Sequence, residues 1–184
     1  MTMQWHNEPP NWSEQDNFLQ MTSGFKTDFW RKTHYGFIRD TGHFRYQTIT
    51  GNFMAKVKIT GQYHALYDQA GLMIREDETT WLKCSVEFVD GTQYASTVVT
   101  RDYSDWSIVQ LPSNPESLWL KLERQDETIK TACSLDGEQY NMMRLAYLTI
   151  TETVQVGLMC ASPREKAFRL FLLIGKFNKI VFFS

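Results

Sequence analysis

Hydrophobic and polar residues alternate along most of the chain from about Gly51 onward, in short runs rich in β-branched and aromatic side chains. A period of two residues is typical of strands that bury one face. Gly, Asp, Asn and Pro interrupt these runs at regular intervals and favour turns. The pattern predicts nine strands, which are Phe44 to Thr50, Phe53 to Ile59, Ala70 to Arg75, Trp81 to Val89, Ala95 to Arg101, Ser107 to Gln110, Leu118 to Gln125, Thr128 to Leu135 and Thr153 to Cys160. Many short strands separated by turns indicate an all-β sandwich of two antiparallel sheets.

Two segments depart from this rhythm. Met142 to Tyr147 is the best candidate for a helix, although it is short. The chain from Arg164 to its end holds five basic residues, one acidic residue and the apolar run Leu170 to Ile174. We expect one domain over residues 1–184 with an atypical C-terminal segment, 164–184, that supplies a final packed strand. The alternative is an exposed segment that pairs with another chain.

Composition and charge narrow the classes of partner. Hydrophobic residues make up 42% of the chain, enough to form a core. The formal net charge of −2 provides no concentrated positive field, so neither nucleic acid nor an anionic membrane is an expected partner. Three widely spaced cysteines and a start without a secretory pattern favour free thiols and the cytoplasm. No run is long and apolar enough for a membrane helix.

Strand parity predicts which polar side chains share a face. In a regular strand, Lys83, Ser85 and Glu87 point away from the side that carries Leu82 and Cys84. Its hairpin partner adds Gln69 and Arg75 to the polar face, and the next strand adds Thr97 and Arg101. We expect this face to be solvated and concave, as in jelly-roll proteins that bind ligands in a groove. The alternative is an ordinary polar surface with cross-strand ion pairs.

Tryptophan rings at strand ends and in loops point to carbohydrate, because a flat ring can stack on the apolar face of a sugar. Trp30, Trp81 and Trp106 are the candidates here, and the alternative for each is a place in the core. The residues predicted to bind a ligand are Trp30, His34, Tyr67, Asp68, Gln69, Arg75, Trp81, Lys83, Glu87, Arg101, Asp105 and Trp106.

Signals for catalysis are weak. Glu87 is a candidate acid or nucleophile for glycoside hydrolysis, with Asp68 or Asp105 as helper, but no acid lies two or four positions away on its face. The four histidines occur singly, without the spacing of a metal site. Nucleotide-binding and serine-hydrolase motifs are absent. We therefore expect no cofactor and no metal.

Several longer segments carry a resemblance to a known family: WHNEPPNW, DFWRKTHYGFIRDTGHF, YDQAGLMIR, WLKCSVEF, VVTRDYSDWS, SLDGEQYNMMR and VGLMCASP. Together they resemble the DUF1349 family from about Trp5 to Pro163. The resemblance implies a concanavalin A-like lectin/glucanase fold and no particular reaction. The family-like polar and aromatic residues are Asp28, Trp30, His34, Tyr35, Tyr67, Asp68, Gln69, Arg75, Trp81, Lys83, Glu87, Arg101, Ser104, Asp105 and Trp106. The close of the chain, AFRLFLLIGKFNKIVFFS, departs from the family's usual final strand.

Three functions follow as hypotheses. The leading one is a non-catalytic module that binds a carbohydrate or a sugar-like metabolite on the concave sheet. The second is a cytoplasmic protein that interacts with a metabolic enzyme, because the family includes a yeast protein implicated in the regulation of enolase. A glycoside hydrolase that uses Glu87 is the third.

Overall fold

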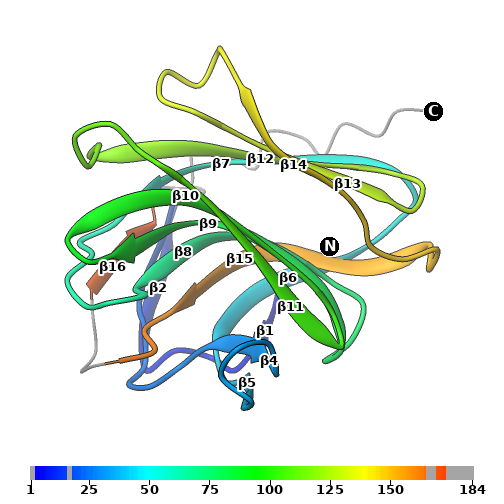
Figure 1. Cartoon of the computed structure of the whole chain (residues 1–184), viewed down its shortest axis with the longest axis horizontal. Coiled ribbons are helices and arrows are strands. Elements are labelled where there is room, and N and C mark those ends of the chain that lie inside the picture. The colour runs from blue at the N-terminus through cyan, green and yellow to red at the C-terminus, as the bar shows by residue number, and fades with distance from the viewer. Residues whose placement is uncertain (1–2, 16–17, 165–168, 173–184) are drawn as a thin grey trace.

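The computed structural model describes residues 3–15, 18–164 and 169–172, and the secondary structure of these residues consists of β-strands. A seven-stranded antiparallel sheet contains β1 (Gln4–His6), β6 (His43–Thr50), β15 (Thr153–Ala161), β8 (Gln69–Arg75), β9 (Thr80–Val89), β10 (Thr92–Arg101) and β11 (Tyr103–Gln110), in that order. A four-stranded antiparallel sheet contains β14 (Asn141–Tyr147), β13 (Thr128–Ser134), β12 (Ser117–Gln125) and β7 (Phe53–Thr60). These two sheets form a concanavalin A-like jelly-roll sandwich (Figure 1).

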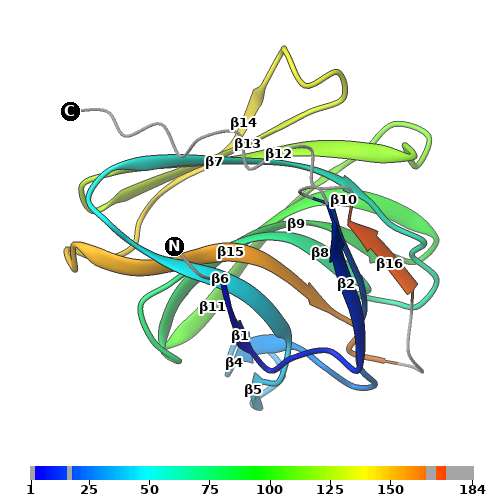
Figure 2. The same ribbon diagram turned by 180° about the vertical axis from the view of Figure 1, so that it is seen from behind.

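Two smaller sheets complete the arrangement. One contains β16 (Arg169–Leu172), β3 (Phe18–Thr22) and β2 (Asn11–Gln15), and the other pairs β4 (Phe29–Arg31) with β5 (Ile38–Asp40). Figure 2 shows β2 and β16 beside one end of the stacked sheets. The buried Leu19 and Met21 of β3 join the core between the two large sheets.

Alternation along each strand divides the seven-stranded sheet into two faces. Leu72, Leu82 and Cys84 belong to the core between the two large sheets. The opposite face, here called the outer face, carries Met73 and Trp81, which belong to a second buried cluster. Gln69, Arg75, Lys83 and Glu87 share the parity of Met73 and Trp81 and lie on this outer face, whereas Thr97 and Arg101 have the opposite parity.

The outer face is covered rather than solvated. In Figure 1, β4 and β5 lie on the opposite side of the seven-stranded sheet from the four-stranded sheet. Phe29 and Trp30 of β4 pack in the second buried cluster. Arg75 on β8 donates two hydrogen bonds of 2.8 Å to the carboxylate of Asp40 at the end of β5, which fastens this cover to the sheet. The expectation of an open, wet sheet surface is wrong for this reason.

All nine strands predicted from the sequence are present, with ends that differ by a few residues. The predicted helix at Met142 to Tyr147 is wrong, because this segment is β14 and pairs with β13. Sheet pairing satisfies its backbone hydrogen bonds and overrides a weak helical propensity. Within the atypical C-terminal segment, residues 169–172 form a strand paired with β3, and residues 165–168 and 173–184 lie outside the described residues.

Gly71 on β8 is required by the close approach of β9. A Cβ atom at this position would lie 2.0 Å from the carbonyl oxygen of Cys84 and 2.6 Å from the Cα of Ser85. We expect Gly71→Ala to lower the free energy of unfolding by about 3 kcal/mol, because backbone has to move. Gly51→Ala is the control, because nothing lies within 4 Å and only its positive φ is strained, at about 1 kcal/mol. Equal losses in urea denaturation would contradict this explanation.

Candidate functional site

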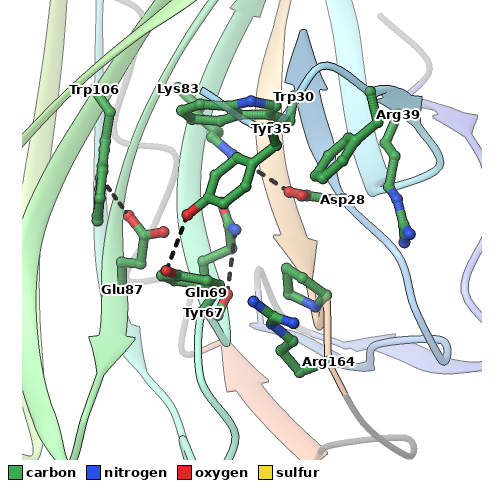
Figure 3. A pocket seen from close by; sticks show the side chains of 12 residues that line it. Asp28, Trp30, Tyr35, Arg39, Tyr67, Gln69, Lys83, Glu87, Trp106 and Arg164 are labelled. Atoms are coloured by element: carbon green, nitrogen blue, oxygen red, sulfur yellow. Dashed lines mark hydrogen bonds and ion pairs between the residues drawn. The ribbon is translucent and has the colours of Figure 1, made fainter. Parts of the chain in front are cut away.

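A cavity of about 190 Å³ lies between the outer face and its cover. Five aromatic rings and five charged side chains contribute to its wall (Figure 3). The volume corresponds to roughly six water molecules at about 30 Å³ each. It is smaller than the roughly 300 to 1,000 Å³ typical of pockets for drug-sized ligands. The lining residues are Asp28, Trp30, Tyr35, Phe37, Arg39, Tyr67, Gln69, Lys83, Glu87, Trp106, Pro163 and Arg164.

A buried lysine forms part of the floor. Lys83 projects from β9, and its side chain is only 2% exposed. Its ammonium donates a hydrogen bond of 2.8 Å to the carbonyl oxygen of Phe29 and lies 3.8 Å from Oδ1 of Asp28. Lys83 therefore connects the sheet to the cover while it contributes a positive charge to the cavity.

Glu87 lies four residues after Lys83 on β9, so the two side chains point to the same face of the sheet. Its carboxylate accepts a hydrogen bond of 2.9 Å from Nε1 of Trp106, which also donates to Oγ of Ser96 at 3.1 Å. Trp106 lies on β11, and Figure 3 shows its ring standing beside Glu87 at one side of the cavity. The carboxylate thus fixes the orientation of one aromatic wall.

Burial is the main influence on the three ionisable groups at the floor. It raises the pKa of Asp28 and of Glu87, although attraction to Lys83 partly opposes both shifts. It lowers the pKa of Lys83, which Asp28 and Glu87 partly oppose. Each group therefore favours its neutral form more than it would in water, and the ion cluster is stable only because its members compensate one another.

Gln69 is the cross-strand neighbour of Glu87 and is 2% exposed. Its Nε2 donates to the backbone oxygen of Tyr67 at 3.2 Å. Its Oε1 is buried and accepts no hydrogen bond from any residue that the structure describes. A buried acceptor without a donor costs free energy, so this oxygen is an acceptor available to a hydroxyl or N–H group placed in the cavity.

Two tyrosines meet across the cavity. The hydroxyls of Tyr35 and Tyr67 are 3.1 Å apart and share a hydrogen bond. This bond, followed by burial, raises the pKa of Tyr35 to about 12. Tyr67 has a φ of 70°, which a bulky residue adopts only where the surrounding structure holds it. Trp30 and Phe37 each lie within 6 Å of the Tyr35 ring, so the cavity has an almost continuous aromatic wall.

The structure brings together six of the residues predicted to bind a ligand: Trp30, Tyr67, Gln69, Lys83, Glu87 and Trp106. Of the others, Arg75 faces the same side but is engaged by Asp40. Trp81 is 1% exposed and packs against Phe29, so the alternative of a place in the core is confirmed for this ring and it does not line the cavity. It lies beneath the cover, in the second buried cluster.

Asp68 does not line the cavity and has a structural role instead. Its carboxylate accepts hydrogen bonds from the backbone N–H groups of His64 and Ala65 and from the hydroxyl of Ser162. These contacts hold the turn before β8 in place. They also remove Asp68 as a partner for Glu87 in a two-carboxylate reaction, and Asp28 is the acid that shares the cavity with Glu87.

Thr97 and Arg101 face the wrong way for the predicted site. The turn at Asp90 and Gly91 pairs Val89 with Thr92, which sets Ser96 opposite Ser85 on the outer face. Thr97 therefore points into the sandwich, where its hydroxyl bonds to that of Thr131 at 3.0 Å. Arg101 lies over the ring of Tyr147, 4.5 Å from its centroid.

His34 and Asp105 lie in a neighbouring open hollow that shares Trp30, Tyr35 and Trp106 with the cavity. Phe37, Arg39, Pro163 and Arg164 line the cavity but were not predicted. Arg39 and Phe37 are close to family-like residues in the sequence, whereas no pattern indicates that Arg164 reaches this face.

Residues 3–15, 18–164 and 169–172 contain no group of three or more His, Cys, Asp or Glu side chains placed to hold a metal ion. The same part of the chain has no helix with the length and apolar character needed to cross a bilayer.

The two stacked antiparallel sheets, with a cavity between the outer face and its cover, define a jelly-roll protein with a small cavity lined by polar and aromatic side chains. The chain belongs to the DUF1349 family, described as proteins of unknown function, whose model matches residues 5–172. Regulation of enolase protein 1 of Saccharomyces cerevisiae is 34% identical over 166 residues, which are 90% of this chain and 84% of that protein.

Solved structures agree with this assignment. A crystal structure of a functionally unknown protein from Saccharomyces cerevisiae is 34% identical, with a TM-score of 0.90 over 94% of this chain and 93% of that one. Carbohydrate binding module CBM66 from Bacillus subtilis is 13% identical, with a TM-score of 0.58 over 92% of each chain. The second likeness shows the shared fold alone.

The raised pKa of Glu87 predicts a pH dependence of stability. The carboxyl of Glu87 holds its proton more tightly in the folded state than in the unfolded state, where its pKa is near 4.5. The contribution of Glu87 is therefore fully present below pH 4.5 and is lost as the pH rises through the raised pKa. We expect Glu87→Gln to gain stability relative to the wild type as the pH rises from 4 to 8 in urea denaturation.

Glu123→Gln is the matched control with the opposite sign. Burial raises the pKa of Glu123, but hydrogen bonding from Lys121 and attraction to Lys121 and Lys130 outweigh it, and the net pKa is lowered. Its contribution is present above pH 4.5 and is lost as the pH falls, so this variant should lose stability relative to the wild type as the pH rises. If the free energy of unfolding relative to the wild type changed with pH in the same direction for both variants, the raised pKa of Glu87 would be contradicted.

Proposed function

We propose that this protein is a binding module whose cavity holds a sugar or a sugar-like polyol. The observation that carries the proposal is the buried Oε1 of Gln69, to which none of the described residues donates a hydrogen bond although Gln69 lines a polar cavity. A ligand hydroxyl placed against it would supply that donor. The neighbouring carboxyl of Glu87 can accept a second hydroxyl, and such paired groups are how proteins distinguish polyols.

The aromatic wall supports the same class of ligand. Sugars combine hydroxyl edges with apolar C–H faces, and tryptophan and tyrosine rings offer a flat apolar surface for those faces. The ring of Trp106 is held by Glu87 and Ser96, so little freedom is lost when a ligand stacks on it. The shared fold of the carbohydrate binding module is compatible with this proposal.

In this proposal Glu87 binds the ligand and does not act as a catalytic residue. One of its oxygens already accepts from Trp106, and its charge helps to compensate Lys83. A glycoside hydrolase needs a carboxyl pair free to exchange protons or attack the sugar. Asp28 and Glu87 instead both interact with the same buried ammonium.

Gln69→Met tests the proposal because it separates binding from folding. Methionine keeps the length of the side chain and removes the unpaired acceptor. We expect the free energy of unfolding to stay within about 1 kcal/mol, because the lost bond to Tyr67 is offset by relief of the buried acceptor. Calorimetric titration against a panel of monosaccharides should show at least a tenfold loss of affinity.

Gln155→Met, on β15 of the same sheet and outside the cavity, is the control and should bind like the wild type. No binding of any monosaccharide by the wild type would refute the proposed function.

A second candidate is an interaction with a metabolic enzyme, for which the name of the yeast relative suggests enolase. The supporting observation is a set of exposed apolar residues on β14, where Met142 is 62% and Leu145 is 60% exposed. β14 is an edge strand, so its free side could contact a partner.

Leu145→Lys should weaken binding to purified enolase at least tenfold, because a charge would enter an apolar contact. Surface plasmon resonance would measure this effect. Phe25→Lys, which changes an apolar residue that is 56% exposed elsewhere, is the control. Unchanged affinity in the Leu145 variant, or no binding by the wild type, would remove this candidate.

A further inference from the structure

The charges of the cavity are distributed unevenly. Near the floor, Asp28 and Glu87 compensate the ammonium of Lys83. At the mouth, Arg39 and Arg164 add two further positive charges. The cavity therefore has three basic side chains against two carboxyls. Burial raises the pKa of both carboxyls and lowers the pKa of Lys83, so the groups at the floor compensate one another and the two arginines supply the remaining positive charge.

Neither arginine is committed to an ion pair within the part of the chain that the structure describes. Arg39 donates to the backbone oxygen of Lys26 at 3.2 Å and lies 5.1 Å from the centroid of the Phe37 ring. Arg164 lies 5.7 Å from the centroid of the Tyr67 ring. Contact with a ring face positions a guanidinium and leaves N–H groups at its edge free for an acceptor.

Both arginines stand on anchored backbone. Arg39 belongs to β5, one residue before the Asp40 that is bonded to Arg75. Arg164 lies two residues after Ser162. The backbone N–H of Ser162 donates to the hydroxyl of Thr27 at 3.0 Å, and its carbonyl accepts from the N–H of Thr27 at 3.1 Å. The fold therefore anchors the chain on which both arginines stand, and the ring contacts position their guanidinium groups.

The two ends of the cavity differ in chemistry. Figure 3 shows Trp106 and Glu87 on one side, and Arg39 and Arg164 on the other, with Tyr35 and Tyr67 between them. The first side suits hydroxyl groups and a C–H face. The second suits an anion, because guanidinium groups bind carboxylates and phosphates through paired hydrogen bonds.

We propose that the ligand is an anionic sugar, a sugar phosphate or a sugar acid, with its polyol part against Gln69 and Trp106 and its anionic group between Arg39 and Arg164. This inference rests on the proposed sugar-binding function and specifies the ligand class. Phosphate and carboxylate share the chemistry that the arginines recognise, and the experiment separates them.

The test uses matched sets of ligands in calorimetric titration of the full chain. Each set contains a neutral sugar, its 6-carboxylate and its 6-phosphate, on glucose, galactose and mannose scaffolds. In at least one set, an anionic member should bind at least tenfold more tightly than its neutral parent at low salt. This advantage should shrink as the salt concentration rises, because exposed charges are screened.

Arg39→Gln and Arg164→Gln should each lower the affinity for the anionic ligand several-fold more than the affinity for its neutral parent. Arg101→Gln is the matched control, because this arginine also lies over a tyrosine ring but on the other face of the sheet. Thermal melting should be similar for all three variants, since none of these arginines forms an ion pair among the described residues.

The outcomes separate the two proposals. If neutral sugars bind and no anionic derivative binds more tightly, the inference fails and the proposed sugar binding stands. If anionic derivatives bind more tightly but both arginine variants keep the full advantage, the arginines are not the anion site and the inference again fails. If none of the nine ligands binds, both proposals fail. Preference for the phosphate or for the carboxylate identifies the class of anionic group.

Discussion

The buried ammonium of Lys83 is the constraint on which the site depends. A cation removed from water is tolerated only where acceptors and opposite charges surround it. The carbonyl of Phe29 and the carboxyl of Asp28 come from the covering segment, whereas Glu87 comes from the same strand as Lys83. If the cover lifted, Lys83 would lose two of these partners at once. The docking of residues 28–40 on the sheet and the formation of the cavity therefore depend on the same contacts of Lys83.

Local periodicity predicts much of this architecture because it needs only neighbouring residues. The alternation in Trp81 to Val89 correctly places Lys83 and Glu87 on one face, and the Asp90-Gly91 turn marks the hairpin. The same information cannot tell whether a polar face is solvated or covered, since the contacts of the cover with Arg75 and Lys83 span 35 and 54 residues of the chain. The burial of Trp81 and the engagement of Arg75 by Asp40 both depend on that cover.

The other errors have equally local causes. Thr97 and Arg101 lie on the inner face because the pairing of Val89 with Thr92 across the turn gives them the opposite parity from Ser96. Met142 to Tyr147 contains good helix formers, but its residues complete the edge of the four-stranded sheet. Arg164 reaches the cavity because Ser162 and Thr27 hold two distant segments together, a contact that no sequence period reveals.

Charge compensation also determines what the cavity can select. The floor uses Asp28 and Glu87 to neutralise Lys83, so the charges there are already satisfied and offer a ligand directional hydrogen bonds more than net attraction. Arg39 and Arg164 at the mouth are held by rings rather than by carboxylates, and their charge is available to a ligand. In the proposed complex, the floor would orient the ligand and the mouth would supply the electrostatic attraction. Discrimination between hydroxyl patterns and recognition of an anionic group would then depend on different residues of one small cavity.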